Sequence, residues 1–241
     1  MWLNIAAKLV PGIIKTGMSI AKNRRETRRF ESVAEMKHAE RMATGEIEYQ
    51  KAVIATESNF FDKEILPIKA KNDKGIEDLV MIDEGIRFDA SLDKLAGLKP
   101  VSDGGVITAG NASLITDGAA AVLICNEEGL KKISATPRAE IVSISVVGDD
   151  PVYMLTGPIP ASFKALDTAG LSIDDMDIYE VNEAFAPVPL AWATELKADR
   201  TKLNVNGGAM ALGHPLGATG AKLMTTMLHE LERRNGKYAL Q

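Results

Sequence analysis

Apolar residues recur every three or four positions in the last long segment of the chain, residues 218–234. The apolar positions on this face are Leu223, Met224, Met227, Leu228 and Leu231. This period places them on one side of a helix, so the segment is predicted to be a long amphipathic helix. Residues 160–169 and 188–197 are also predicted to be helical, and Gly170 is suited to ending the first of them.

Short apolar runs separate these helices and indicate strands. In the second half of the chain the runs cover residues 140–147, 177–181 and 203–206, and residues 237–241 look like the opening of another strand. A buried strand is also predicted at residues 117–125, where small alanines would allow close packing of neighbouring layers. Because strands alternate with helices, the pattern predicts an α/β fold.

The first half of the chain is more polar, and its periodicity is weaker. Residues 24–57 are rich in Arg, Glu, Ala and Met and are predicted to be helical. Two short strands are predicted at residues 65–69 and 79–82, on either side of a polar turn that contains glycine. A short helix is predicted to begin at residues 126–128 and to end near residue 132.

The first 25 residues contain five basic side chains and no acidic one. A basic, amphipathic start of this kind is typical of an organelle presequence or of a helix that lies on a membrane surface. The simpler hypothesis is a basic flap on a soluble protein, because Pro11 and Gly12 break the segment into two short pieces.

The composition excludes several classes of function. The 241 residues include 28 Lys and Arg against 33 Asp and Glu, so nucleic acid is not an expected partner. No apolar run reaches the roughly 18 to 20 residues that span a bilayer, so a membrane partner is not expected either. The single cysteine, Cys125, excludes a disulfide framework within the chain. The three histidines, His38, His214 and His229, are too scattered to indicate a metal site.

The densest candidate for chemistry is the glycine-rich segment 204–220, in which five glycines surround His214. Glycines let a backbone approach a ligand closely. The segment lacks the Gly-Lys-Ser/Thr of a phosphate loop and the G-x-G-x-x-G order of a dinucleotide site. A lone histidine is often structural, but a position between Gly213 and Pro215 is a rigid loop position that favours a functional role.

Two further loops are candidates. Asn182-Glu183-Ala184-Phe185 follows a predicted strand, where α/β folds collect ligand-binding groups, although Asn182 alone is also a common turn residue. Residues 105–121 combine small side chains and hydroxyls, which suits an extended ligand arm, with a plain tight loop as the alternative. Cys125 is predicted to be buried beside apolar residues, where a thiol is inert as a nucleophile.

Four segments together resemble the thiolase family in order and spacing: residues 105–121, 156–160, 182–185 and 207–220. The resemblance extends from about residue 64 to residue 241 and is most specific in the glycine-histidine loop. It implies an α/β fold of the layered αβαβα type, present here in incomplete form. The implied domains are a loop-domain region at 1–104, diverged over 1–60, the end of the N-terminal half at 105–138, and the C-terminal half at 139–241 without its final cysteine loop and strand.

The resemblance also implies a reaction. Thiolases cleave a 3-ketoacyl-CoA with free CoA, or condense two acyl-CoAs. By this likeness His214 activates a nucleophilic cysteine and donates to the thioester oxygen, and Asn182 holds a water at the same oxygen. The positions implied to flank the pantetheine arm are Ala109, Ser113, Met154, Ala184 and Phe185. The glycines predicted to support the histidine loop are Gly207, Gly208, Gly213 and Gly217. CoA is therefore expected as a substrate, with no permanently bound cofactor and no metal.

Departures from the family pattern matter as much as the matches. Neither catalytic cysteine of the family lies in these 241 residues. The first is expected upstream, and the second is expected roughly 30 residues after His214, from the family spacing and the number of cysteines in the chain. Leu114 stands where the family usually has glycine and could narrow the pantetheine channel. By itself, therefore, the chain is predicted to be inactive.

Two hypotheses follow from these departures. The chain belongs either to an acyl-CoA acyltransferase of the thiolase family or to a non-catalytic remnant that binds acyl-CoA or a partner. A complete hydrolase based on His214 lacks a nucleophile in a suitable setting. The full-length protein is expected to be a homodimer or homotetramer. Its expected location is cytoplasmic, with mitochondrial or peroxisomal as the alternatives.

Overall fold

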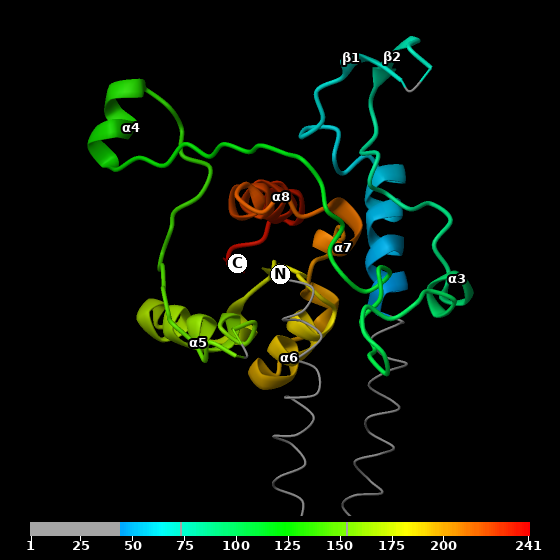
Figure 1. The fold of residues 1–241 in the computed structure, drawn as a ribbon. Helices are drawn as coiled ribbons and strands as arrows, with labels where there is room; N and C mark the ends of the chain where they lie inside the picture. Colours follow the sequence, from blue (N-terminus) through cyan, green and yellow to red (C-terminus); the bar gives the residue numbers. More distant parts are fainter. Residues whose placement is uncertain (1–43, 73, 153) are drawn as a thin grey trace, which may run out of the picture.

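The computed structural model describes residues 44–241, except 73 and 153. The basic N-terminal segment and the first part of the helix predicted at 24–57 lie outside the described residues. Figure 1 shows α8 (Thr219–Arg234) near the middle of the molecule, with α7 (Ala209–Leu212) close by. The helical residues 44–57 flank α7 on one side, and α5 (Pro158–Ala169) and α6 (Pro187–Leu196) lie together on another.

After the helical residues 44–57, the elements of the first half are short. β1 (Ile68–Lys71) and β2 (Glu77–Val80) form an antiparallel hairpin whose register pairs residue 68 with residue 80. The hairpin confirms the predicted pair of strands around a polar turn, with β1 shifted three residues later and β2 two residues earlier. It is followed by α3 (Leu92–Ala96) and, after a long irregular stretch, by α4 (Glu127–Ile133). Asn126 begins α4 by accepting a hydrogen bond from the Gly129 N–H, as is usual for an N-cap, so the predicted helix is confirmed.

A small parallel sheet lies within the second half. β3 (Ile178–Tyr179) pairs with β4 (Ala239–Leu240), and Tyr179 also forms a single parallel bridge with Leu203. The strand predicted at 203–206 is therefore reduced to one bridge. Two short 3-10 helices, Ile173–Asp175 and Arg200–Lys202, precede β3 and Leu203. The predicted helices are present as α5, α6 and α8. Gly170 ends α5 with a φ of 66°, in the left-handed region that suits glycine.

Two clusters of buried apolar residues hold these elements together. One surrounds Trp192 of α6, whose ring meets Tyr179 edge-on at 5.3 Å and whose indole N–H donates to Ser162 of α5 at 2.8 Å. The other packs the helical residues 44–57 against Ala211 and Leu212 of α7. The second cluster matters for the site, because it fixes the start of the loop that contains His214.

Two predicted strands are wrong. Residues 117–125 and 140–147 are extended, but neither forms a strand ladder with another described segment. An extended segment becomes a strand only when a neighbour completes its backbone hydrogen bonds. The apolar side chains therefore lie open, with Leu123 at 78% and Val146 at 81% exposure. The prediction that Cys125 is buried is wrong for the same reason, because the thiol is exposed.

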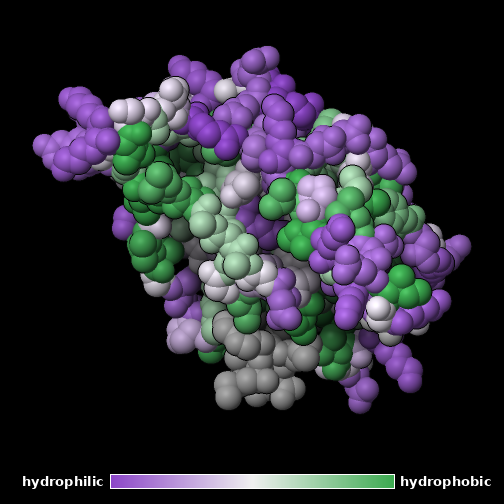
Figure 2. Space-filling model, turned by 90° about the horizontal axis from the view of Figure 1, so that it is seen from above, coloured by the Kyte–Doolittle hydropathy of each residue, from purple (hydrophilic) through white to green (hydrophobic). Residues whose placement is uncertain are grey.

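Figure 2 looks down on the side of the molecule where β1, β2 and α4 lie in Figure 1. Apolar patches interrupt the polar surface there. The exposed apolar residues of the whole described chain include Ile68, Leu79, Val80 and Met81 of the hairpin region. None of the described helices combines the length and the apolar character that a transmembrane helix requires.

Candidate active site

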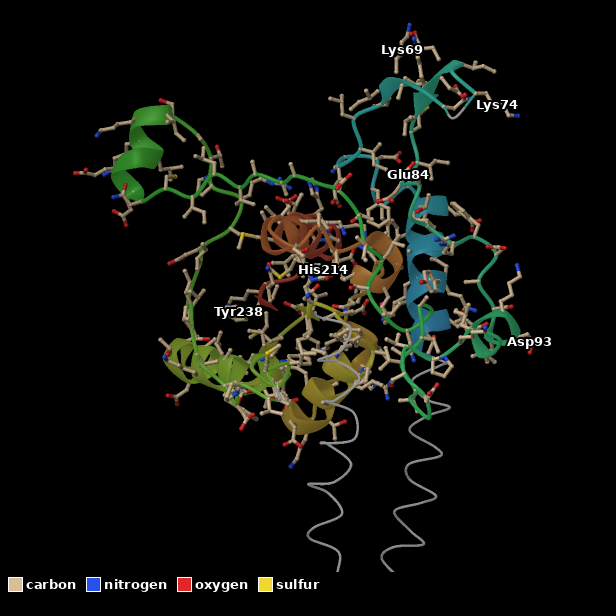
Figure 3. The ribbon with its side chains drawn as sticks, viewed as in Figure 1. Lys69, Lys74, Glu84, Asp93, His214 and Tyr238 are labelled. Atoms are coloured by element: carbon tan, nitrogen blue, oxygen red, sulfur yellow. The ribbon has the colours of Figure 1, made fainter. Side chains whose placement is uncertain are left out.

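His214 lies in the loop that joins α7 to α8, in the central part of the molecule and far from Lys69 and Lys74 at the hairpin (Figure 3). Gly213, just before it, has a φ of 88°, and a Cβ at this position would lie 2.5 Å from the side chain of Thr116. Only glycine fits this combination of backbone and space. The His214 N–H then donates to the Leu114 carbonyl at 2.9 Å, which fixes the loop against residues 111–114.

Both ring nitrogens of His214 have polar neighbours. Nδ1 lies 2.7 Å from Thr219 Oγ1, and Nε2 lies 3.4 Å from Asn182 Nδ2. Partial burial lowers the pKa of His214, and the nearby Lys222 ammonium lowers it further. Lys222 contacts the same loop, because its Nζ donates to the Gly213 carbonyl at 3.4 Å. The imidazole is therefore neutral at neutral pH and can accept a proton.

The structure brings three of the predicted loops together. Ser113 N–H donates to the Ala184 carbonyl at 3.1 Å, and Ala112 forms an antiparallel bridge with Phe185. On the other side, Leu114 N–H donates to the Ala209 carbonyl at 3.2 Å. Residues 111–114 thus lie between the loop that contains Asn182 and the loop that contains His214. Ser113, Ala184 and Phe185 are neighbours, as the sequence analysis requires of residues that flank one ligand.

The remaining predicted residues have fewer contacts with the loops around His214. Ala109 is exposed in the turn that precedes residues 111–114. Met154 has a φ of 38°, and its backbone hydrogen bonds run to Asp150 and Gly157 within its own loop rather than to the loops around His214. Gly207 approaches the helical residues 44–57 closely, whereas Gly217 is surrounded by open space. The structure therefore gives no steric reason for glycine at position 217.

The side chain of Glu183 connects the loop that contains Asn182 with the segment that leads to His214. Its carboxylate is fully buried and accepts hydrogen bonds from the Met210 N–H at 3.1 Å and from the Asn204 side chain at 2.6 Å. A Cβ on Gly208 would overlap this carboxylate, so position 208 is restricted by space rather than by its ordinary φ of −101°. Glu183 is the residue after Asn182, and Met210 lies four residues before His214. The hydrogen bond between Glu183 and Met210 therefore helps to fix Asn182 and His214 relative to each other.

Two more carboxyl groups are buried beside Glu183. Glu48, from the helical residues 44–57, pairs with Lys51 at 2.8 Å, yet burial and the neighbouring Glu183 charge raise the pKa of Glu48 well above its ordinary value. Burial, followed by the Glu183 charge, also raises the pKa of Glu180, whose two oxygens have no hydrogen-bond partner among the described residues. Burial raises the pKa of Glu183 as well, and the hydrogen bonds from the Met210 N–H and the Asn204 side chain offset part of that rise.

An open pocket of about 440 Å³ begins next to His214. Residues 116–120 line one side of it, and residues 215–218 line the other. The Asn182 Oδ1 atom is buried and accepts no hydrogen bond within the described part of the chain. Within that part, no group of three or more His, Cys, Asp or Glu residues could hold a metal ion. His214 and Asn182 thus offer a neutral base and an amide group, and the pocket lies along the segment that follows His214.

Sequence comparison identifies the family. The model of the thiolase N-terminal domain matches residues 26–128, and that of the thiolase C-terminal domain matches residues 135–241. The chain belongs to the thiolase family. The resemblance drawn from the four loops is thereby confirmed.

Relatives and solved structures agree with this thiolase assignment. The chain is 53% identical over 193 residues to steroid 3-ketoacyl-CoA thiolase FadA6 of Mycobacterium tuberculosis, a match that covers 80% of the chain and 46% of the relative. It is 49% identical over 187 residues to human mitochondrial 3-ketoacyl-CoA thiolase, covering 77% of the chain and 47% of the relative. The chain thus spans about half the length of these thiolases.

The fold comparison gives the same result. A crystal structure of human mitochondrial 3-ketoacyl-CoA thiolase matches with a TM-score of 0.77 at 44% identity, over 84% of this chain and 51% of that one. The Bacillus anthracis acetyl-CoA acetyltransferase structure matches with a TM-score of 0.79 at 41% identity, over 87% of this chain and 54% of that one. The predicted α/β fold, a thiolase fold in partial form, is confirmed. The domain boundaries and the roles of the site residues stay predictions.

Four residues around this thiolase site escaped the sequence analysis as candidates: Glu48, Glu183, Thr219 and Lys222. For Thr219 and Lys222 a signal existed, since they lie about one turn apart at the start of the predicted helix that follows His214. Glu183 lay inside a loop that was singled out, but nothing in the sequence connected it to Gly208. Glu48 is more than 130 residues away along the chain, so only the folded structure brings it to Glu183.

Proposed function

We propose that this chain supplies the histidine and asparagine of a thiolase active site, and that the whole protein transfers acyl groups between CoA thioesters. The observation that carries the proposal is the contact of His214 Nε2 with Asn182 Nδ2 at 3.4 Å, on two loops that both hydrogen-bond to residues 111–114. Both residues lie on loops whose sequences match the family.

The geometry suits the chemistry of such a transfer. A neutral His214 takes the proton of an attacking thiol and then offers the same proton, on Nε2, to the thioester oxygen as negative charge develops there. Asn182 holds a water toward that oxygen. One preorganised donor of this kind is worth about 10² to 10³ in rate. The attacking thiol is not Cys125, which lies at the exposed approach to α4.

For the substrate, we propose that the pantetheine arm of CoA runs along Ala109, Ser113, Ala184 and Phe185, with Met154 joining them when the ligand is bound. The hydrogen bond and the bridge between residues 112–113 and 184–185 support one continuous wall. A solved structure of human mitochondrial 3-ketoacyl-CoA thiolase contains CoA, which supports CoA as the ligand. Breakdown of fatty-acid or related 3-ketoacyl-CoAs is the proposed metabolic context.

Three further assignments belong to the same proposal. The regions 1–104, 105–138 and 139–241 are the loop-domain region, the end of the N-terminal half and the C-terminal half. The full-length protein is a homodimer or homotetramer. Its proposed compartment is the cytoplasm, with mitochondria or peroxisomes as the alternatives, and the names of the mammalian relatives support mitochondria.

Calorimetric titration of the chain with CoA tests the binding part of the proposal. We expect saturable binding that Ser113→Trp weakens at least tenfold, because the new ring fills the path of the arm. Lys132→Trp on the exposed α4 is the size-matched control and should bind like the parent chain. Absence of saturable binding, or equal binding by both variants, would contradict the proposal.

A thiolysis assay of the full gene product separates the enzyme from the non-catalytic remnant. The enzyme is expected to turn over acetoacetyl-CoA with CoA and to lose this activity on His214→Ala. CoA binding without any turnover by the full gene product would favour the remnant. The 241 residues assayed alone are expected to be inactive in either case.

A further inference from the structure

Thr219, the first residue of α8, is buried, and its hydroxyl contacts the edge of the His214 ring. Its Oγ1 lies 2.7 Å from His214 Nδ1 and 3.2 Å from the Pro215 carbonyl. A hydroxyl has one proton to donate, whereas a backbone carbonyl can only accept. When Thr219 donates to Pro215, the lone pairs on Oγ1 face the ring, so Nδ1 must carry the proton of their hydrogen bond.

We propose that Thr219 is a positioning residue that holds neutral His214 in the Nδ1–H form and leaves Nε2 without a proton on the side that faces Asn182. The inference deepens the proposed function and rests on it for its catalytic meaning. In a protein, the hydrogen bond at one ring nitrogen of a neutral histidine determines which nitrogen carries the proton. Here the hydrogen bond between Nδ1 and Thr219 makes that choice.

The surroundings of Nε2 agree with this form. Asn182 presents Nδ2, a donor, to Nε2 at 3.4 Å, and a bare ring nitrogen is the acceptor that such a donor needs. The Asn182 Oδ1 atom, which is buried and unpartnered among residues 44–241 as described, is then free to accept from a water or a ligand. The opposite tautomer would require the Asn182 amide to turn over and would leave no basic ring nitrogen on the side that faces Asn182.

The side chain of Thr219 is well suited to holding this geometry. Its own N–H also donates to the Pro215 carbonyl, at 3.0 Å, so the first turn of α8 and the hydroxyl are fixed to the same acceptor. A β-branched side chain in a helix has few rotamers, which limits the directions that the hydroxyl can take. The consequence for a transfer reaction is that Nε2 can accept a thiol proton without a prior change of tautomer.

Long-range ¹H–¹⁵N spectra of the ¹⁵N-labelled chain, recorded above the histidine pKa, show which ring nitrogen bears the proton. His214→Gln identifies the His214 signals. We expect the parent chain and Thr219→Ser, which keeps the hydroxyl, to show protonated Nδ1 and bare Nε2. Thr219→Val, which keeps the shape, should move most of the His214 population toward the Nε2–H form.

Thr225→Val is the matched control, because Thr225 donates to the Ala221 carbonyl at 2.9 Å from the same helix and should leave the His214 signals unchanged. If Thr219→Val does not fold, Thr219→Ala takes its place. A parent chain with Nε2–H, or a hydroxyl-free variant with an unaltered tautomer, would overturn the inference. The readout needs no CoA, so a correct tautomer in a chain that fails to bind CoA would refute the proposed function alone.

Discussion

Gly208→Ala tests whether Glu183 and the histidine loop are packed as closely as the structure indicates. The backbone at position 208 has φ −101° and ψ −158°, which alanine adopts without strain. A Cβ there, however, would overlap the buried Glu183 carboxylate. Relief requires Glu183 or the start of α7 to move, and either shift weakens the hydrogen bond from the Met210 N–H.

The expected cost follows from these contacts. Overpacking a filled interior typically costs about 1 to 3 kcal/mol, and a hydrogen bond to a charged group contributes about 1.5 to 3 kcal/mol. The gain from a stiffer unfolded chain is smaller, at about 0.4 to 1 kcal/mol. We therefore expect a loss of about 2 kcal/mol in the free energy of unfolding. For a chain of this length that corresponds to a decrease in Tm of roughly 4 to 8 °C.

Urea and thermal unfolding followed by circular dichroism measure this change. Gly217→Ala is the control in the same glycine-rich segment, since a Cβ there meets no atom within 4 Å. That variant should be as stable as the parent or slightly more stable. In the double variant Glu183→Ala with Gly208→Ala, the removed carboxylate leaves room, so the combined cost should be smaller than the sum of the two single costs. Equal stability of the Gly208→Ala and Gly217→Ala variants would refute the reasoning.

Three other predictions concern charge, catalysis and the thiol. Burial raises the pKa of Glu180, so the folded chain binds its proton more tightly than the unfolded chain does, and stability falls as pH rises from the ordinary carboxyl pKa toward the raised one. Glu180→Gln should remove this fall, so the variant should be more stable than the parent above neutral pH. Urea titrations at a series of pH values measure this difference. The same pH dependence of stability in variant and parent would contradict the prediction. In the full gene product, His214→Ala should lower kcat at least by the factor of about 10² to 10³ that one oxyanion donor contributes. Asn182→Ala should lower kcat less, because Asn182 acts through a held water. A larger effect of Asn182→Ala would contradict the assigned roles. Cys125 in the folded chain should react with a thiol reagent as fast as in urea, because it is exposed, and marked protection would show that it is covered.

Local signals in the sequence were sufficient for most helices of the second half. The apolar stripe of residues 218–234 became α8, and Gly170 ended α5 as a left-handed glycine. Such features depend on residues within one or two turns of each other. The glycine-histidine loop was singled out by its unusual composition, which reflects contacts such as that between Gly213 and Thr116.

Features that depend on distant residues were not predictable. Residues 117–125 have the composition of a buried strand, but strand formation depends on a neighbour that the described residues do not supply. Composition alone therefore misplaced Cys125. The buried carboxyl groups of Glu48 and Glu183 come from segments far apart in the chain, and no periodicity links them. The candidate site residues were predicted from motifs, whereas the residues that contact and support them became visible only in the structure.

In the proposed complex, the loop that contains His214 and the loop that contains Asn182 contact the thioester end of a CoA ligand. The most direct test is to titrate the labelled chain with acetyl-CoA while following the His214 ring signals, with exposed-face His229 of α8 as the internal reference. The account predicts saturable changes at His214 with acetyl-CoA, smaller changes with CoA, and none at His229. Saturable binding that leaves His214 unchanged, or no binding at all, would contradict it.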